Sequence, residues 1–347
     1  GEVSALAGDK TDDPGLAKRL EKANRDAAKV YDKLAKLDHK PEDAARFEGY
    51  LFTALELDPS KARIGKVVAL VKKLAGNRQK AAQAGSLLTK LREADPKGNY
   101  DSLEAELAKK DVVLIKSPDH ALVGYLSLPK SWKKGKREWQ VLVTVDGAGS
   151  NFLGAARNFA KSRGSRDFIV LAPCTFANTN DIAAKKYPFY SPEVIDEGKR
   201  NRIGFDVAGL LALLEVVKER YGGTDKIGIT GFSGGGNLTY CFTMLHPDRV
   251  LFAAPACGNF NPGMARGAEP IEGGGPPIHI LTGANDPHRD WTHGNKNSPG
   301  IEPQSNQAEA KLKELGFTNV RRTMLPGVKH SSCARQVYEF ADEVMSR

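Results

Sequence analysis

The chain has 347 residues, of which 40% are apolar, enough to form one large and one small domain with sizeable cores. Its net charge is +9, with 28 Lys and Arg against 21 Asp and Glu in residues 1–140, and 23 against 21 in the remainder. Acidic residues interrupt the basic stretches, which indicates a solvated helical surface rather than a nucleic-acid-binding site. Because no run of about 18 apolar residues is present, we expect no membrane-spanning helix.

The cysteines are widely spaced and form no C-x-x-C pair: Cys174, Cys241, Cys257 and Cys333. We therefore expect no zinc site, and we interpret the cysteines as buried free thiols, with a single disulfide as the alternative. The chain begins with Gly1 rather than Met, which is compatible with removal of a signal peptide. On that basis we favour a secreted or periplasmic protein over a cytoplasmic one.

Residues 14–110 are rich in Ala, Leu, Lys and Glu, with apolar positions three or four apart, and this pattern predicts helices. Two of the expected helix ends are alike, "YLFTALELDPSKA" and "SLLTKLREADPKGN", with Pro59 and Pro96 lying 37 residues apart. This spacing resembles the period of tetratricopeptide-type repeats, although a stable array needs about three repeats. We expect a small helical module over residues 1–110, with a true repeat module as the alternative. Its basic surface is a candidate contact for a protein or a polymer.

From residue 112 the pattern changes to short apolar runs that are typical of strands. Strands are expected at 112–117, 121–129, 140–146, 168–173, 226–231, 250–256, 278–283 and 320–326. Helices are expected at 151–163, 204–221, 234–246, 304–315 and 332–346. This alternation predicts a mainly parallel sheet with helices on both faces over residues 111–347. In such a sheet, ligands bind at the carboxyl ends of the strands.

The stretch "IGITGFSGGGNLTYCFTML", residues 227–245, has a single serine at the expected turn from strand to helix. Gly231 and Gly235 are the small neighbours that a G-x-S-x-G elbow requires around Ser233. In such an elbow the serine hydroxyl is exposed at the end of a strand. The alternative is a glycine-rich turn with an incidental serine.

A serine becomes a nucleophile when a base takes its proton, and the base needs a carboxylate to orient it. Asp286 follows the strand pattern "IHILTG", and His330 follows "VRRTMLP". Asp290 is the alternative acid, four residues farther from the strand. His330 is the only histidine that follows the last expected strand. The others considered are His279 within a strand, His246 at a helix end, and His288 and His293 in the loop of the acid.

The chain order of serine, aspartate and histidine resembles that of the α/β-hydrolase superfamily. The stretches "GFSGGG", "TGANDP" and "PGVKH" are similar to dienelactone-hydrolase-like, polyhydroxybutyrate-depolymerase-like and feruloyl esterases. The resemblance implies an α/β-hydrolase fold and a serine esterase that needs no metal or organic cofactor. It also implies oxyanion donors at the backbone N–H groups of Gly234 and Ala148. Asp146 stands where the family often has histidine.

Residues 175–205 are polar, lack a clear period, and are expected to fold over the site as a cap or lid. The candidate substrate pocket consists of Tyr187, Phe189, Tyr190 and Trp291. These rings favour aryl or hydroxycinnamoyl esters or short polyester segments, unless they only pack the segment onto the body.

We thus expect a hydrolase of small-molecule or polymeric carboxylic esters. One alternative is a serine peptidase of the prolyl-oligopeptidase type, which has the same triad order. The other is an interaction protein that uses its helical module beside an inactive hydrolase scaffold.

Overall fold

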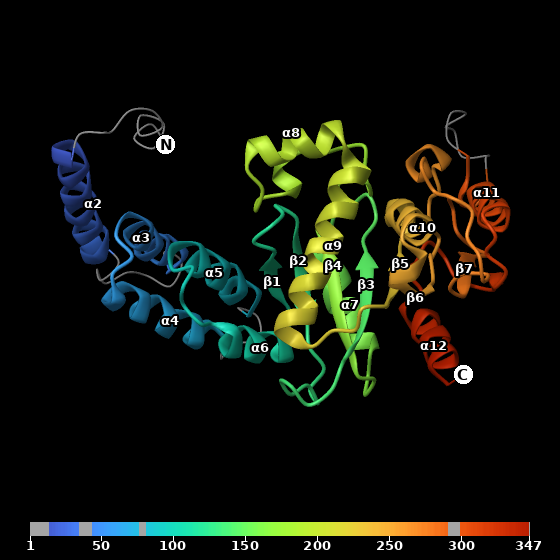
Figure 1. Cartoon of the computed structure of the whole chain (residues 1–347), viewed down its shortest axis with the longest axis horizontal. Helices are drawn as coiled ribbons and strands as arrows, with labels where there is room; N and C mark the ends of the chain where they lie inside the picture. The colour runs from blue at the N-terminus through green and yellow to red at the C-terminus, as the bar shows by residue number, and fades with distance from the viewer. Residues whose placement is uncertain (1–13, 35–43, 76–80, 291–298, 347) are drawn as a thin grey trace. The chain divides into compact units, whose positions relative to one another are not determined.

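The computed structural model of the chain describes residues 14–34, 44–75, 81–290 and 299–346 (Figure 1). The chain divides into two compact units, Gly1–Ser102 and Leu103–Arg347. The division falls within helix α6 (Asp101–Lys110), whereas the sequence placed the boundary after this helix. Within the described ranges, no helix is long and apolar enough to cross a membrane.

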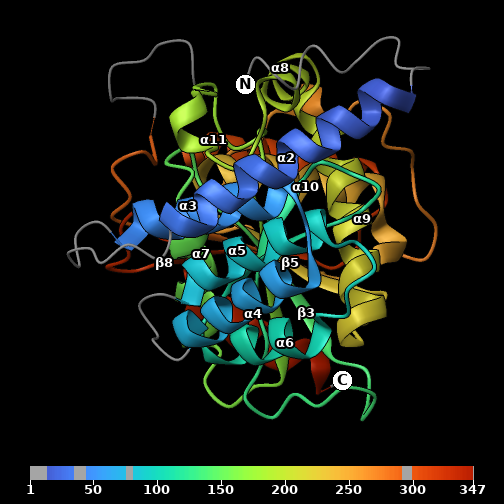
Figure 2. The ribbon, with the colours of Figure 1, turned by 90° about the vertical axis from the view of Figure 1, so that its left-hand side faces the viewer.

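The first unit is built from helices, as the spacing of its apolar residues predicts. They are α2 (Pro14–Leu34), α3 (Ala44–Leu57), α4 (Lys61–Ala75) and α5 (Ala81–Ala94). Consecutive helices of this series contact one another (Figure 2). Buried Ala54, Leu55, Val71 and Leu88 belong to the core of the unit, since burying apolar side chains is what stabilises helices of this length.

The second unit is built on an eight-stranded sheet in the order β1-β2-β4-β3-β5-β6-β7-β8. The strands are β1 (Val113–Lys116), β2 (Val123–Ser127), β3 (Gln140–Val145), β4 (Phe168–Pro173), β5 (Ile227–Gly231), β6 (Val250–Ala253), β7 (Ile278–Gly283) and β8 (Val320–Leu325). Strand β2 pairs antiparallel with β1 and β4, and all other pairs are parallel. Each strand expected from the sequence is present, which confirms the mainly parallel sheet.

Helices cover both faces of this sheet (Figure 1), as the alternation of strands and helices predicts. On one face, α7 (Phe152–Ser162) contacts β2, β3 and β4 and packs against α12 (Ala334–Met345). The other face carries α9 (Arg202–Tyr221), α10 (Gly236–Leu245) and α11 (Ile301–Glu314). Between β4 and α9 the chain forms a short 3₁₀ turn and the helix α8 (Pro192–Arg200), which contacts α9.

Parallel strands place the turns after β3, β5, β7 and β8 at one edge of the sheet. Ser233 follows β5, Asp286 follows β7, and His330 follows β8. The topology therefore brings three loops that are distant in sequence to the same edge.

Candidate active site

Ser233 occupies a strained turn between β5 and α10. Its φ angle is 51°, in the left-handed region that residues with a side chain rarely adopt. The turn is tight because a Cβ atom at Gly231 would lie 2.2 Å from the carbonyl oxygen of Gly235, and one at Gly235 would lie 2.3 Å from that of Val145. The glycines on either side of Ser233 are thus required by close backbone contact, as the G-x-S-x-G pattern indicates.

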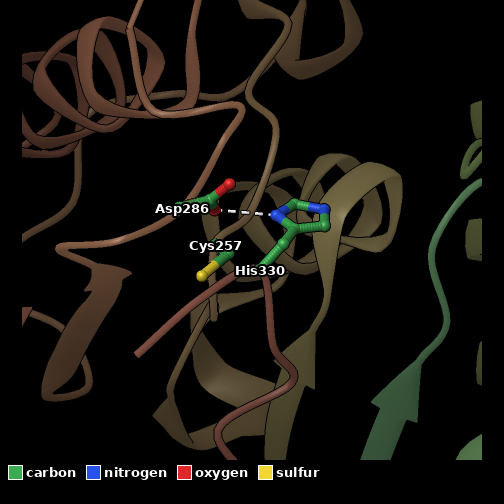
Figure 3. A group of neighbouring side chains, drawn as sticks. All are labelled: Cys257, Asp286 and His330. Atoms are coloured by element: carbon green, nitrogen blue, oxygen red, sulfur yellow. Dashed lines mark hydrogen bonds and ion pairs between the residues drawn. The ribbon is translucent and has the colours of Figure 1, made fainter. Parts of the chain in front are cut away.

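His330 and Asp286 form a hydrogen-bonded pair at the same edge. The Nδ1 atom of His330 lies 2.7 Å from Oδ2 of Asp286, and the side chain of Asp286 is fully buried (Figure 3). The other carboxylate oxygen of Asp286 accepts the N–H of His288 at 2.8 Å. Asp290, the alternative acid, is instead paired with Arg289 at the surface. The structure therefore places Asp286, and not Asp290, against His330.

The His330 ring also packs against Phe232, the residue that precedes Ser233, with 4.6 Å between the ring centroids. Both rings line a cavity of about 250 Å³ that Asp146 and Asn158 also border. Ser233 itself is partly exposed beside these groups. A cavity next to a histidine at the carboxyl edge of the sheet is a suitable place for a small substrate group.

The thiols of Cys257 and Cys333 affect the electrostatics around His330. Burial disfavours the charged form of this histidine, but the nearby Cys257 thiol and the Asp286 carboxylate outweigh burial and raise the pKa of His330. The interaction between the two thiols lowers the pKa of Cys257 and raises that of Cys333. Both cysteines are buried free thiols, as expected, and so are Cys174 and Cys241.

Cys257, Asp286 and His330 are also the candidate metal ligands of the described part of the chain, since their ligand atoms lie within 4.8 Å of one another (Figure 3). However, His330 Nδ1 and Asp286 Oδ2 are only 2.7 Å apart. Two ligand atoms on a tetrahedral zinc ion would lie roughly 3.3 Å apart. The 2.7 Å distance between these two atoms therefore fits a hydrogen bond better than joint coordination of a metal ion.

The loop from β3 to α7 carries the predicted oxyanion donor Ala148. The carboxylate of Asp146 accepts the N–H of Asn151 at 2.6 Å, and burial raises the pKa of this carboxyl despite hydrogen bonds from the backbone. The side chain of Asn151 in turn caps α7 by accepting the N–H of Gly154. A Cβ atom at Gly147 would lie 3.0 Å from Cβ of Ser233. Asp146 therefore folds this loop beside the serine, which explains an aspartate at this position.

The predicted aromatic pocket residues do not share one environment. Tyr187 and Tyr190 are buried, and their hydroxyl groups donate to the backbone carbonyls of Thr175 and Cys174. They stack within the segment that follows β4. Phe189 is partly exposed and borders an open pocket of about 510 Å³ next to Gly149 and Ser150. Trp291 lies outside the described residues.

Two of the other histidines considered from the sequence have local roles. His279 in β7 bonds to Thr323 through Nε2 at 2.8 Å, and burial lowers its pKa to about 4. His246 ends α10. The ring of His288 lies 4.8 Å from that of His330. His293 lies outside the described residues.

Three polar residues near the site were not singled out from the sequence. Asn178 donates through Nδ2 to the carbonyl oxygen of Gly147, and Lys186 donates to that of Ala148. Asp206 is fully buried and accepts the N–H groups of the segment that leads to Asn178. The only signal in the sequence is that Asn178 follows a strand end, since nothing local connects it to the loop after β3.

No family model matches the sequence, and no curated protein matches it either. Solved structures do resemble its fold. A thermostable esterase matches with 20% identity over 68% of this chain and 62% of the other, with a TM-score of 0.43. Poly(aspartic acid) hydrolase-1 from Sphingomonas sp. KT-1 matches with 17% identity over 69% and 100%, with a TM-score of 0.48. Acylaminoacyl peptidase from Pyrococcus horikoshii matches with 18% identity over 68% and 41%, with a TM-score of 0.43.

This chain thus spans less than two thirds of the length of the esterase and of the peptidase. Its own sheet order, with the serine turn after β5 and the histidine loop after β8, is that of the α/β-hydrolase fold. Leu103–Arg347 therefore has the α/β-hydrolase fold, as the resemblance of the three motifs implies.

Proposed function

We propose that the protein is a serine hydrolase that cleaves carboxylic esters through an acyl-enzyme intermediate. The main support is the 2.7 Å hydrogen bond between the buried carboxylate of Asp286 and Nδ1 of His330, at the sheet edge where Ser233 is held at a positive φ angle. A carboxylate on Nδ1 fixes the imidazole tautomer that has its lone pair on Nε2. Nε2 is then the atom that accepts a proton from a nucleophile.

In this proposal Oγ of Ser233 attacks the ester carbonyl while its proton passes to Nε2 of His330. Asp286 holds the Nδ1–H and stabilises the imidazolium. The negative charge on the carbonyl oxygen is bound by the backbone N–H groups of Gly234 and Ala148. Gly234 lies in the first turn of a helical segment, where N–H groups have no partner within the helix.

The attack forms the C–O bond between Ser233 and the acyl carbon, and collapse of the tetrahedral intermediate breaks the ester C–O bond. The departing alkoxide takes the proton from the imidazolium of His330, which leaves the acyl group on Ser233. Water then attacks the acyl carbon, gives its proton to the imidazole, and releases the acid as the serine regains its proton. No cofactor takes part in these steps.

Esters are proposed over amides because an alkoxide is a better leaving group than an amine anion. The pocket beside Phe189 is the described feature that supports an aryl ester preference, since an aromatic ring there gains roughly 1 kcal/mol by stacking. Tyr187 and Tyr190 contribute to this preference only through the shape of the segment, because they are buried.

The test combines a nucleophile probe with two variants. A fluorophosphonate is expected to label Ser233, and Ser233→Ala and His330→Ala are each expected to lose about 10³-fold or more in kcat while remaining folded. Labelling at another residue, or retention of most activity in either folded variant, would overturn the proposal.

A panel of matched aryl, short-alkyl and long-chain esters, run beside peptide amides, tests the substrate class. Aryl esters are expected to be turned over several-fold faster than long-chain esters. Faster turnover of a peptide amide than of every ester would favour the peptidase alternative. A long-chain optimum would remove only the aryl preference.

A further inference from the structure

The segment Cys174–Thr179, which follows β4, lies buried between the two parts of the proposed oxyanion hole. Each of its residues is at least nine-tenths buried, and Asn178 is 2% exposed. The segment contacts the loop after β3 through the side chain of Asn178, and it contacts the turn after β5 through the backbone of the same residue.

The side-chain contact is made to the carbonyl oxygen of Gly147. Nδ2 of Asn178 donates to this oxygen at 2.7 Å and lies 3.2 Å from Oγ of Ser150. Because a carbonyl oxygen only accepts hydrogen bonds, the atom of Asn178 that faces it must be the nitrogen. The same oxygen also accepts the N–H of Ser150 at 3.0 Å. The direction of the Gly147 carbonyl is thus set by two donors.

That carbonyl belongs to the same peptide unit as the N–H of Ala148. A peptide unit is planar and its trans C=O and N–H bonds point in opposite directions. Fixing the Gly147 oxygen therefore fixes the direction of the Ala148 N–H. A second bond, from Lys186 to the carbonyl oxygen of Ala148 at 3.2 Å, holds the next peptide unit.

The backbone contact is made to Gly234, the residue after Ser233. A Cβ atom at Gly234 would lie 1.9 Å from the carbonyl oxygen of Asn178, so the two backbones touch. Asn178 therefore contacts both residues whose N–H groups are proposed to bind the oxyanion.

Asp206 on α9 binds the backbone of the segment Cys174–Thr179. Its carboxylate accepts the N–H of Phe176 at 2.9 Å and that of Ala177 at 2.6 Å. Asn237 adds a weaker bond of 3.4 Å to the carbonyl oxygen of Ala177. The two bonds to Asp206 fix the backbone from which the Asn178 side chain extends.

The amide of Asn178 is not placed for stability alone. Among the described residues, its buried Oδ1 has no hydrogen-bond partner. An unpaired buried oxygen destabilises a fold, and an apolar side chain would avoid that loss. What the asparagine adds at this position is the bond to Gly147.

We infer that Asn178 is a positioning residue of the oxyanion hole, which directs the N–H of Ala148 through the Gly147 carbonyl and sets the distance to Gly234. This inference rests on the proposed serine hydrolase function. Asn178 does not touch the substrate; it acts through the peptide unit that does.

The test uses Asn178→Ala and Asn178→Asp in the full chain, with 4-nitrophenyl acetate as substrate. Removing one oxyanion donor from a serine hydrolase lowers kcat by about 10²- to 10³-fold, so misdirecting one is expected to lower kcat by about 10- to 100-fold. KM is expected to stay within about threefold, because the oxyanion forms only in the transition state. Affinity for a boronic acid, which mimics the tetrahedral intermediate, is expected to fall by the same factor as kcat.

Asn237→Ala is the matched control, since it removes an asparagine that binds the same segment without touching the Gly147 carbonyl. It is expected to leave kcat and boronic acid affinity unchanged. Thermal melting of all three variants shows whether they are folded, and the two substitutions at Asn178 serve as independent tests.

A kcat within about threefold of wild type in a folded Asn178 variant would overturn the inference, since a misdirected donor must slow the chemical step. An increase in KM as large as the decrease in kcat would also overturn it, and so would an equal decrease in kcat in the Asn237 control. Either pattern indicates that the substitution disturbs the structure of the site as a whole. If wild type is labelled by a fluorophosphonate at Ser233 and these results are found, only the role of Asn178 fails. If wild type is not labelled there, the proposed function fails first.

Discussion

At the scale of single residues, the pair of His330 and Asp286 controls the acid–base chemistry of the proposed site. The nearby Cys257 thiol and the Asp286 carboxylate raise the pKa of His330 above its ordinary 6.5, although burial acts in the opposite direction. The imidazole must be neutral to accept the proton of Ser233. Activity is thus expected to depend on how far this pKa is raised.

The first prediction concerns the pH dependence of kcat/KM. The acid limb is expected to have a midpoint above pH 6.5, because the base becomes neutral only above its raised pKa. Cys257→Ala removes a thiol that raises this pKa, so the acid limb of the variant is expected to move to lower pH. Cys241→Ala, which removes another buried free thiol in α10, is the control and leaves the limb in place. An unchanged limb in Cys257→Ala would contradict the prediction.

The second prediction concerns Asp206. Burial raises its pKa to about 7, although hydrogen bonds from Phe176 and Ala177 act to lower it. In the unfolded chain an aspartate has a pKa of about 3.9. Between these two values the folded state binds more protons than the unfolded state, so the contribution of Asp206 to stability falls as the pH rises from about 4 to about 7.

The measurement is the free energy of unfolding of wild type and of Asp206→Asn across this range. The stability of wild type relative to the variant is expected to decrease with rising pH and then to level off above about pH 7. A difference that does not change with pH would mean that Asp206 does not titrate in this window.

At the scale of elements, α6 belongs with the sheet rather than with the helices before it. The carbonyl oxygen of Ala108 accepts the N–H of Leu128 at 2.8 Å, and buried Glu104 bonds to the hydroxyl group of Tyr221. Leu107 is fully buried as well. These contacts explain why the division of the chain falls before Leu103.

The third prediction follows from these contacts. A chain that begins at Asn99 keeps α6 and is expected to be soluble and folded. A chain that begins at Lys109 loses the helix, exposes apolar surface that Leu107 covers, and is expected to aggregate. Size-exclusion chromatography and thermal melting distinguish the two. Equal stability of both chains would show that α6 is dispensable.

At the scale of the whole molecule, the proposed chemistry lies entirely within Leu103–Arg347. Ser233, Asp286, His330 and the oxyanion loop all belong to the sheet unit. The charge excess is shared between the units, with 20 Lys and Arg against 16 Asp and Glu in residues 1–102, and 31 against 26 in residues 103–347. The basic character assigned to the N-terminal module is therefore not particular to it.

The fourth prediction is that the chain beginning at Asn99 turns over small soluble esters with kcat/KM within about twofold of the full chain, because two domains with separate cores can act independently. The comparison uses one soluble ester and equal concentrations of labelled active sites. A large loss in a folded truncated chain would mean that the helical unit contributes to the site.

Much of the fold could be predicted because periodicity is a local property. The eight strands and five of the six α-helices described between and after them were recognisable from apolar runs and spacing, and the order of Ser233, Asp286 and His330 followed from strand ends. Helix α8 was not recognised, since it lies in the polar segment 175–205 that was expected to have no clear period. The helical character of the N-terminal residues was recognisable for the same reason. The division within α6 was not, since the helix has the same period whichever unit it packs against.

The sequence by itself determined the elements, their order and the three residue types that could act at one sheet edge. Only the tertiary structure decided which aspartate binds His330. Asp286 and Asp290 follow the same strand, and the fold places the carboxylate of Asp286 against His330 and that of Asp290 against Arg289. It also decided that Tyr187 and Tyr190 are buried rather than exposed. The contact of Asn178 with Gly147 joins residues 31 apart in the chain. No local pattern encodes such a contact, because it depends on how two loops are brought together when the parallel strands pair.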